Sequence, residues 1–270
     1  MVIRVDDPAD PRLDAFRWRE RQLASVSQRR EKIGAGMFVA EGDLVVTRAL
    51  DAGCTTVALL CDERHGAELG TRVRDDVPVY VGDDALRKEV TGLGVPLSAT
   101  GLFRRPALLE PDTMLRESGF VVVMEAVDNP TNLGAIVRSA AALGWDGLLL
   151  DSTSADPLAR RALRVSMGTG LSLPFGRLDP DENLVTALHR HGFVTCALTP
   201  DDAADDISTV KTGGAAKIAV LLGSERAGLS TGALSSAMHK VRIPMHSGTD
   251  SLNVGAAAAI ALQMLGPNAR

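Results

Sequence analysis

The second half of the chain alternates short apolar runs with segments of helical periodicity. Residues 120–127 (FVVVMEAV) form the apolar run expected of a strand buried on both faces, and a helical pattern follows over residues 132–143. Four further strands are expected, separated by helix-compatible segments, at residues 147–151, 193–198, 217–223 and 241–245. This order predicts an α/β fold with a mainly parallel sheet covered by helices on both faces.

The first half of the chain indicates a smaller α/β domain. Its β-rich runs lie at residues 37–41, 55–61 and 77–81, with helix-compatible stretches between them at residues 44–52 and 63–74. Residues 103–115 then interrupt the periodicity, as in a connecting segment, with Arg104, Arg105, Pro106 and Pro111. We therefore predict one domain at residues 1–115 and a second at residues 116–270.

Composition and charge limit how the chain can meet nucleic acid. Its 270 residues carry 29 Lys and Arg against 34 Asp and Glu, a net charge of −5, so any RNA contact must be local. Aromatic residues make up only 3%, which argues against a surface of several base-stacking rings. The most basic stretch, residues 12–32, is expected to form an exposed helix. A solvated charged face and an RNA-contacting face explain that stretch equally well.

Several other kinds of site are not indicated. Cys54, Cys61 and Cys196 show no C-x-x-C spacing, so neither a disulfide framework nor a thiolate zinc site is expected. The histidines have no partner at a metal-ligand spacing, and we predict no metal. Neither glycine-rich phosphate fingerprint, of nicotinamide enzymes or of P-loop enzymes, is found. An acidic start and the lack of an apolar run of about 18 residues predict a cytoplasmic protein without a membrane span.

Three segments of the second domain combine glycines with polar side chains near expected helix and strand ends. Taken alone, each fits a structural role: Asn132 as a helix cap, a glycine turn after the strand at 217–223, and Ser251 as the N-cap of an apolar helix at 254–265. Arg138 lies six residues after Asn132, near two helical turns, so we expect both side chains toward one side. The segments contain, in chain order, Asn132, Gly134 and Arg138; Gly223, Glu225 and Gly228; and Ile243, Pro244, Met245, Ser251, Leu252 and Asn253.

In this combination and order, the three segments resemble the motifs of the SpoU branch of the SPOUT RNA methyltransferases. That family transfers a methyl group from S-adenosylmethionine to ribose 2′-hydroxyls. The resemblance covers residues 120–265 and implies a deep trefoil knot in which the cofactor binds. It also implies a homodimer packed through the knot region, with each active site drawing on both subunits. Residues 12–106 resemble, more loosely, an RNA-binding module of the ribosomal-protein type.

The resemblance assigns roles to individual residues. Gly223, Ile243 and Leu252 would supply main-chain contacts to the cofactor, and Leu198 and Thr199 would lie beside its adenosine end. One departure is Arg226, which stands where many members carry glycine. The implied cofactor-binding residues are Leu198, Thr199, Gly223, Ile243, Met245 and Leu252, and the implied catalytic residues are Asn132, Arg138, Glu225, Ser251 and Asn253.

The chemistry that the resemblance implies needs a base, because a ribose hydroxyl is a weak nucleophile until its proton is removed. The family's candidate is Arg138, although a guanidinium is essentially always protonated. Two hypotheses follow. In one, a bound RNA phosphate and the local site help Arg138 to take the proton. In the other, Arg138 only clamps the phosphate in bidentate fashion while the proton leaves by another path.

The substrate is open at the level of sequence. The fused amino-terminal module favours ribosomal RNA over transfer RNA by family analogy alone. A catalytically silent RNA-binding protein of the same fold is the alternative from another class, although the motif side chains are all present. The apolar helix at residues 254–265 predicts burial by more than its own sheet, as in a homodimer interface.

Overall fold

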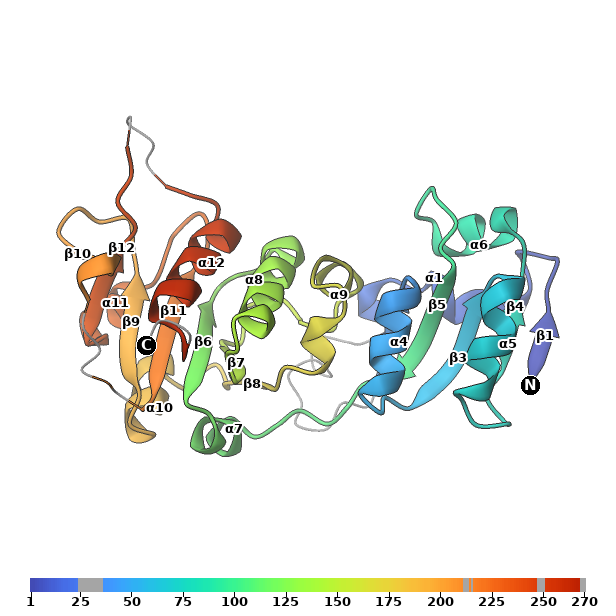
Figure 1. Ribbon diagram of the computed structural model, residues 1–270, viewed down its shortest axis with the longest axis horizontal. Coiled ribbons are helices and arrows are strands. Elements are labelled where there is room, and N and C mark those ends of the chain that lie inside the picture. The colour runs from blue at the N-terminus through green and yellow to red at the C-terminus, as the bar shows by residue number, and fades with distance from the viewer. Residues whose placement is uncertain (24–35, 211–213, 215, 247–250, 268–270) are drawn as a thin grey trace. The chain divides into compact units, whose positions relative to one another are not determined.

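The computed structural model describes residues 1–23, 36–210, 214, 216–246 and 251–267. The chain divides into two compact units, each with its own sheet (Figure 1). The first unit comprises Met1–Ala107 with Leu158–Ser172, and the second comprises Leu108–Pro157 with Leu173–Arg270. No helix among the described residues is long and apolar enough to cross a membrane.

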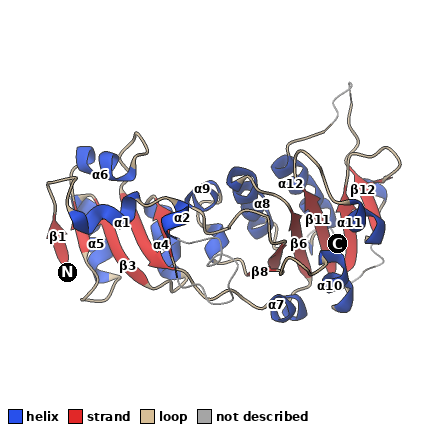
Figure 2. Cartoon of the chain, turned by 180° about the vertical axis from the view of Figure 1, so that it is seen from behind, coloured by secondary structure: helices blue, strands red, loops and turns tan. Residues whose placement is uncertain are grey.

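The first unit is a five-stranded mixed sheet with helices, coloured by type in Figure 2. The strand order is β1-β4-β3-β5-β2, in which β5 runs antiparallel to both β3 and β2. Its strands are β1 (Val2–Arg4), β2 (Met37–Glu41), β3 (Thr56–Cys61), β4 (Val79–Val81) and β5 (Ala99–Arg104). Its helices are η1 (Pro11–Leu13), α1 (Asp14–Arg17), α2 (Glu20–Leu23), α4 (Asp43–Asp51), α5 (Glu63–Thr71), α6 (Asp84–Thr91), α9 (Arg160–Val165) and η2 (Thr169–Leu171).

The second unit is built on a seven-stranded sheet in the order β10-β12-β9-β11-β6-β7-β8, and every pairing is parallel. The strands are β6 (Phe120–Glu125), β7 (Gly147–Leu150), β8 (Phe175–Arg177), β9 (Val194–Leu198), β10 (Asp205–Asp206), β11 (Ile218–Gly223) and β12 (His239–Arg242). The helices are α7 (Pro111–Glu117), α8 (Pro130–Ala142), α10 (Leu184–Arg190), η3 (Ile207–Thr209), α11 (Thr231–Ser236) and α12 (Val254–Leu265).

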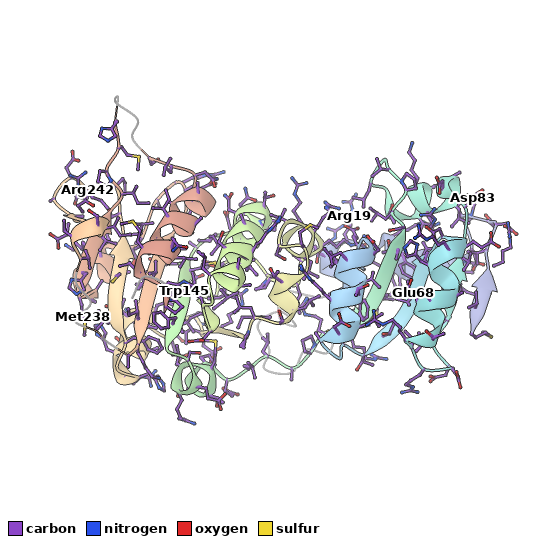
Figure 3. All side chains as sticks on the ribbon, viewed as in Figure 1. Arg19, Glu68, Asp83, Trp145, Met238 and Arg242 are labelled. Atoms are coloured by element: carbon purple, nitrogen blue, oxygen red, sulfur yellow. The ribbon has the colours of Figure 1, made fainter. Side chains whose placement is uncertain are left out.

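The core of the second unit follows from the apolar strands. Side chains of β6 and β11 such as Val121 and Leu221 pack with residues of α7, α10 and α11. Helices α8 and α12 pack against each other, and Trp145, labelled in Figure 3, joins their ends. The Trp145 indole Nε1 donates to the Leu262 carbonyl at 3.2 Å, and its ring meets Phe120 edge to face. Helix α12 also contacts β11, so α12 lies between that strand and α8.

The predicted α/β class with a mainly parallel second sheet is confirmed. Three local expectations are wrong. Pro111 begins α7 rather than lying in a connecting segment, because proline suits the first turn of a helix. Asp205–Asp206 forms β10 beside β12, outside the ranges at which strands are expected. In the basic stretch, Trp18 leaves helical geometry and separates α1 from α2, whereas residues 24–32 lie outside the described residues.

The division into units also differs from the predicted boundary at residue 115. Leu158–Ser172 follows β7 in the chain but belongs to the first unit. The carboxylate of Glu41, whose side chain is only 1% exposed, accepts from Arg160 at 3.0 Å and from Arg164 at 2.6 Å. Arg160 also donates to the Phe16 carbonyl at 2.7 Å. These contacts hold α9 against β2, because a buried carboxylate without its partners is costly.

Candidate functional site

A pocket of about 630 Å³ lies in the second unit, where the carboxyl ends of three parallel strands meet. The residues that line it end or follow β9 and β11, follow β12, begin α12 or, for one residue, lie in α11. In open α/β sheets, ligands bind beyond the carboxyl ends of the strands. The lining comprises Leu198, Thr199, Pro200, Leu222, Gly223, Ser224, Glu225, Arg226, Ala227, Gly228, Leu229, Leu234, Ile243, Met245, Ser251, Leu252, Asn253, Val254 and Ala257.

The loop after β11 forms one wall of the pocket and requires glycine at its start. A Cβ built on Gly223 would lie 2.1 Å from the backbone carbon of Gly228, so no larger residue fits without moving the loop. The loop folds back on itself, since Gly228 N donates to the Ser224 carbonyl at 2.9 Å. Gly228 has φ +68°, a left-handed conformation that favours glycine. The glycines of this segment therefore fix the shape of the wall.

A carboxylate at the end of β6 accepts hydrogen bonds from the residue at which the same loop ends. Glu125 accepts from the Ser230 backbone N–H at 2.7 Å and from the Ser230 hydroxyl at 2.8 Å. The Ser230 oxygen also accepts from Ala233 N and thereby caps α11. Sequence reasoning missed Glu125 and Ser230 as site residues, although an acidic residue at the end of the apolar run FVVVMEAV was an available signal.

Asn253 connects two of the motif segments. Its side-chain Nδ2 donates to Asn132 Oδ1 at 3.0 Å and to Glu225 Oε1 at 2.8 Å. Its Oδ1 accepts from Gly255 N, so Asn253 and not Ser251 is the N-cap of α12. Likewise the N-cap of α8 is Asn129, whereas Asn132 lies inside the helix. Both expected caps were therefore placed on the wrong residue.

Arg138 lies apart from this hydrogen-bonded group. Six helical steps of about 100° leave it about 120° around the axis from Asn132, so the expectation of one shared side is wrong. Asn132 is 7% exposed and faces Asn253, whereas Arg138 is exposed. Arg138 forms no hydrogen bond or ion pair with any residue in the part of the chain that the structure describes.

The pocket collects most of the residues that sequence reasoning selected. All six expected cofactor-binding residues line it. Of the five expected catalytic residues, Glu225, Ser251 and Asn253 line it and Asn132 is joined through Asn253, whereas Arg138 is neither a lining residue nor a hydrogen-bond partner of the group.

A second network, also missed at the level of sequence, positions the start of α8. The Arg177 guanidinium donates to the carbonyls of Asp151, Ser154 and Ala155, in the loop after β7. In turn, the Ser154 hydroxyl accepts from Val127 N at 3.1 Å and Ala155 N donates to the Val127 carbonyl. Arg177 therefore holds the loop after β7, and that loop in turn holds Val127 in the segment that leads into α8.

The titratable groups near the sheet do not indicate a thiol nucleophile or a metal. Burial raises the pKa of the Cys196 thiol, inside β9, to about 11, so it remains protonated at neutral pH. Burial also acts to raise the pKa of Asp151, but hydrogen bonds from Ser154 and Thr153 outweigh it and lower that pKa. Among the described residues, no group of three or more His, Cys, Asp or Glu side chains is arranged to hold a metal ion.

The model of the SpoU rRNA methylase family matches residues 119–263. An uncharacterized tRNA/rRNA methyltransferase of Mycobacterium tuberculosis is 38% identical over 268 residues, and the match covers 95% of this chain and 89% of that protein. The 23S rRNA (adenosine(1067)-2′-O)-methyltransferase of Streptomyces azureus is 32% identical, with 70% of each chain covered. Among solved structures, the SpoU methyltransferase AviRb of Streptomyces viridochromogenes, in complex with S-adenosylmethionine, superimposes with a TM-score of 0.70. It is 27% identical, and the match covers 88% of this chain and 95% of that one.

Proposed function

The chain belongs to the SpoU rRNA methylase family, and from that premise we propose that it transfers a methyl group from S-adenosylmethionine to a ribose 2′-hydroxyl of ribosomal RNA. The single observation that carries the proposal is the convergence of the three motif segments on one pocket. Leu198, Gly223 and Leu252 come from three separate parts of the chain and line the same cavity. If each motif had only a structural role of its own, the three segments would have no reason to meet at one cavity.

The pocket fits the proposed cofactor in size and in chemistry. Its volume, about 630 Å³, lies within the range of small-molecule sites. Leu198, Ile243, Met245 and Leu252 offer apolar surface for the adenine ring, and backbone groups around Gly223 offer polar contacts. When bound, S-adenosylmethionine would supply an electrophilic methyl group on a sulfonium. The lining of this pocket supports that assignment.

The residues around the pocket suit the orientation of a ribose. Asn253 holds Glu225 and Asn132 in one hydrogen-bonded group, so these side chains are already ordered before substrate arrives. Arg138 is exposed and unengaged by described residues, which leaves its planar guanidinium available for an RNA phosphate. We propose that it either clamps that phosphate or, with the phosphate's help, takes the hydroxyl proton. The protein's site of action would be the cytoplasm, with no metal involved.

The proposal includes a homodimer whose interface contains α12. The apolar side chains of Ile260 and Met264 on this helix are each 37% exposed. The knot and the sharing of each active site between subunits belong to the same proposal. The knot and the shared active site rest on the family resemblance and on the parallel sheet whose strands lead into the motif loops.

A transfer RNA substrate is the second candidate, since the Mycobacterium tuberculosis relative is named for both RNAs. The experiment uses total RNA from a strain that lacks the gene, incubated with the purified protein and S-adenosylmethionine. We expect one new ribose 2′-O-methyl group in ribosomal RNA, detected as a bond resistant to alkaline hydrolysis. A new methyl group in transfer RNA supports the second candidate. Cofactor binding without any methyl transfer supports a catalytically silent RNA-binding protein, and a methylated base contradicts the ribose chemistry.

A further inference from the structure

The pocket lining contains one cation, Arg226, and one anion, Glu225, among the residues described. The two side chains are neighbours in sequence but differ in their contacts. The Glu225 carboxylate accepts from Asn253 at 2.8 Å, so it is already engaged. Arg226 is exposed and makes no hydrogen bond or ion pair with a described residue. Its guanidinium is therefore available to an anionic ligand at the mouth of the pocket.

The backbone that carries Arg226 is held in place. Gly228 N donates to the Ser224 carbonyl at 2.9 Å, and Ala227 N donates to the Ser224 hydroxyl at 3.2 Å. The same two residues, Ser224 and Gly228, form an isolated antiparallel bridge across the loop. Arg226 therefore projects from a tight turn whose ends are fixed, and little backbone entropy is lost when its side chain binds.

Exposed carboxylates follow the pocket lining beyond Pro200, and one of them, Asp202, pairs with Arg242 at 3.8 Å. Asp201, Asp202 and Asp205 are exposed and follow directly after the lining residues Thr199 and Pro200. The chain as a whole carries a net charge of −5. Unpaired carboxylates repel an RNA backbone, whereas a cation on the pocket wall attracts it.

We propose that Arg226 binds a backbone phosphate of the RNA substrate at the mouth of the pocket and so sets the side from which the RNA enters. This inference rests on the proposed function. An RNA phosphate suits Arg226 better than the carboxylate of S-adenosylmethionine does, because Arg226 is exposed at the surface, where an RNA chain would lie, whereas the cofactor would lie inside the pocket. A guanidinium also binds a phosphate through two parallel hydrogen bonds.

Equilibrium binding of a radiolabelled 23S rRNA transcript, measured by filter retention across a series of salt concentrations, tests the proposal. The variants are Arg226→Ala, Arg226→Lys and, as a matched control, Arg116→Ala. Arg116 is exposed in the last turn of α7, just before β6, and therefore lies at the amino end of that strand, whereas the pocket lies at the carboxyl ends of the strands. Titration of S-adenosylmethionine into each variant checks that the pocket remains folded.

We expect Arg226→Ala to weaken RNA binding roughly tenfold. The plot of the logarithm of RNA affinity against the logarithm of salt concentration should become shallower by about one, because one phosphate contact is lost. Arg226→Lys should keep that salt dependence, since it keeps the charge, and Arg116→Ala should behave as the unaltered protein. Cofactor affinity should be the same in all. The proposal is overturned if Arg226→Ala matches Arg116→Ala, or if Arg226→Ala weakens S-adenosylmethionine and leaves RNA binding unchanged. Because binding needs no methyl transfer, an inactive but Arg226-dependent complex would contradict only the proposed function.

Discussion

The side-chain amide of Asn253 donates to the carboxylate of Glu225 at 2.8 Å while its oxygen caps α12. One side chain thus fixes the start of a helix and orients an acidic residue of the pocket. A second hydrogen bond from the same Nδ2 reaches Asn132 at 3.0 Å. The capping and orienting roles use different atoms, so substitutions can separate them.

Replacement of Asn253 by Ser should separate these roles. Serine caps helices about as well as asparagine, so Asn253→Ser should change the free energy of unfolding little. It cannot donate to both Asn132 and Glu225, and we expect methyl transfer to fall about 100-fold through loss of orientation. Asn253→Ala should lose activity and also about 1 kcal/mol of stability. Urea unfolding and a methyl-transfer assay measure both effects, and full activity of Asn253→Ser would contradict the orienting role.

Gly223→Ala should abolish tight binding of S-adenosylmethionine. Its Cβ would lie 2.1 Å from Gly228 and 2.2 Å from the backbone N of Leu229, so the pocket wall must move. Gly232→Ala is the matched control, because its Cβ meets only the Ser230 hydroxyl, at 3.8 Å. Calorimetric titration should show that the affinity for S-adenosylmethionine falls about tenfold or more in Gly223→Ala and is unchanged in the control. Equal affinities would remove Gly223 from the proposed site.

Arg138→Ala should abolish methyl transfer while cofactor affinity stays unchanged, since Arg138 does not line the pocket. Arg138→Lys keeps the charge but loses the planar two-donor group, so a bidentate phosphate clamp should fail in that variant as well. Single-turnover rates on the substrate RNA in its unmethylated form, together with cofactor titration, provide the measurement. Wild-type rates in Arg138→Ala would show that Arg138 is neither base nor clamp.

Ile260→Glu should convert the proposed homodimer to a monomer, because it places a charge on the apolar surface of α12. Met238→Glu is the control, since Met238, labelled in Figure 3, is 57% exposed and lies outside α12. Sedimentation at micromolar concentration should give a dimer for the unaltered protein and for the control. A monomeric unaltered protein would contradict the dimer and the shared active site.

Glu41→Gln should destabilise the first unit by about 3 kcal/mol, because it leaves two guanidinium groups facing a buried neutral amide. The control is Glu68→Gln, at an exposed glutamate that is labelled in Figure 3. Urea unfolding followed by circular dichroism measures the difference. If both variants unfold at the same urea concentration, the pairing of Glu41 with Arg160 and Arg164 contributes no net stability.

The amino-acid sequence alone determined the α/β class and the second sheet's main strands. Buried parallel strands need continuous apolar runs, and those runs are visible locally, as at residues 120–127. The motif residues were also recognisable, because their types and order resemble a known family. Their local roles are less predictable, since the sequence predicts Ser251 and Asn132 as helix caps, whereas Asn253 and Asn129 cap the two helices.

Only the tertiary structure decided how distant residues meet. The hydrogen bond between Asn253 and Asn132 spans 121 positions, and the bonds from Ser230 to Glu125 span 105. No local periodicity encodes such pairs, because they depend on the order of strands in the sheet. The same holds for Arg160, which follows a strand of the second unit but pairs with the buried Glu41 of the first. Buried polar groups must find partners wherever the folded chain brings them, and that requirement is satisfied only in three dimensions.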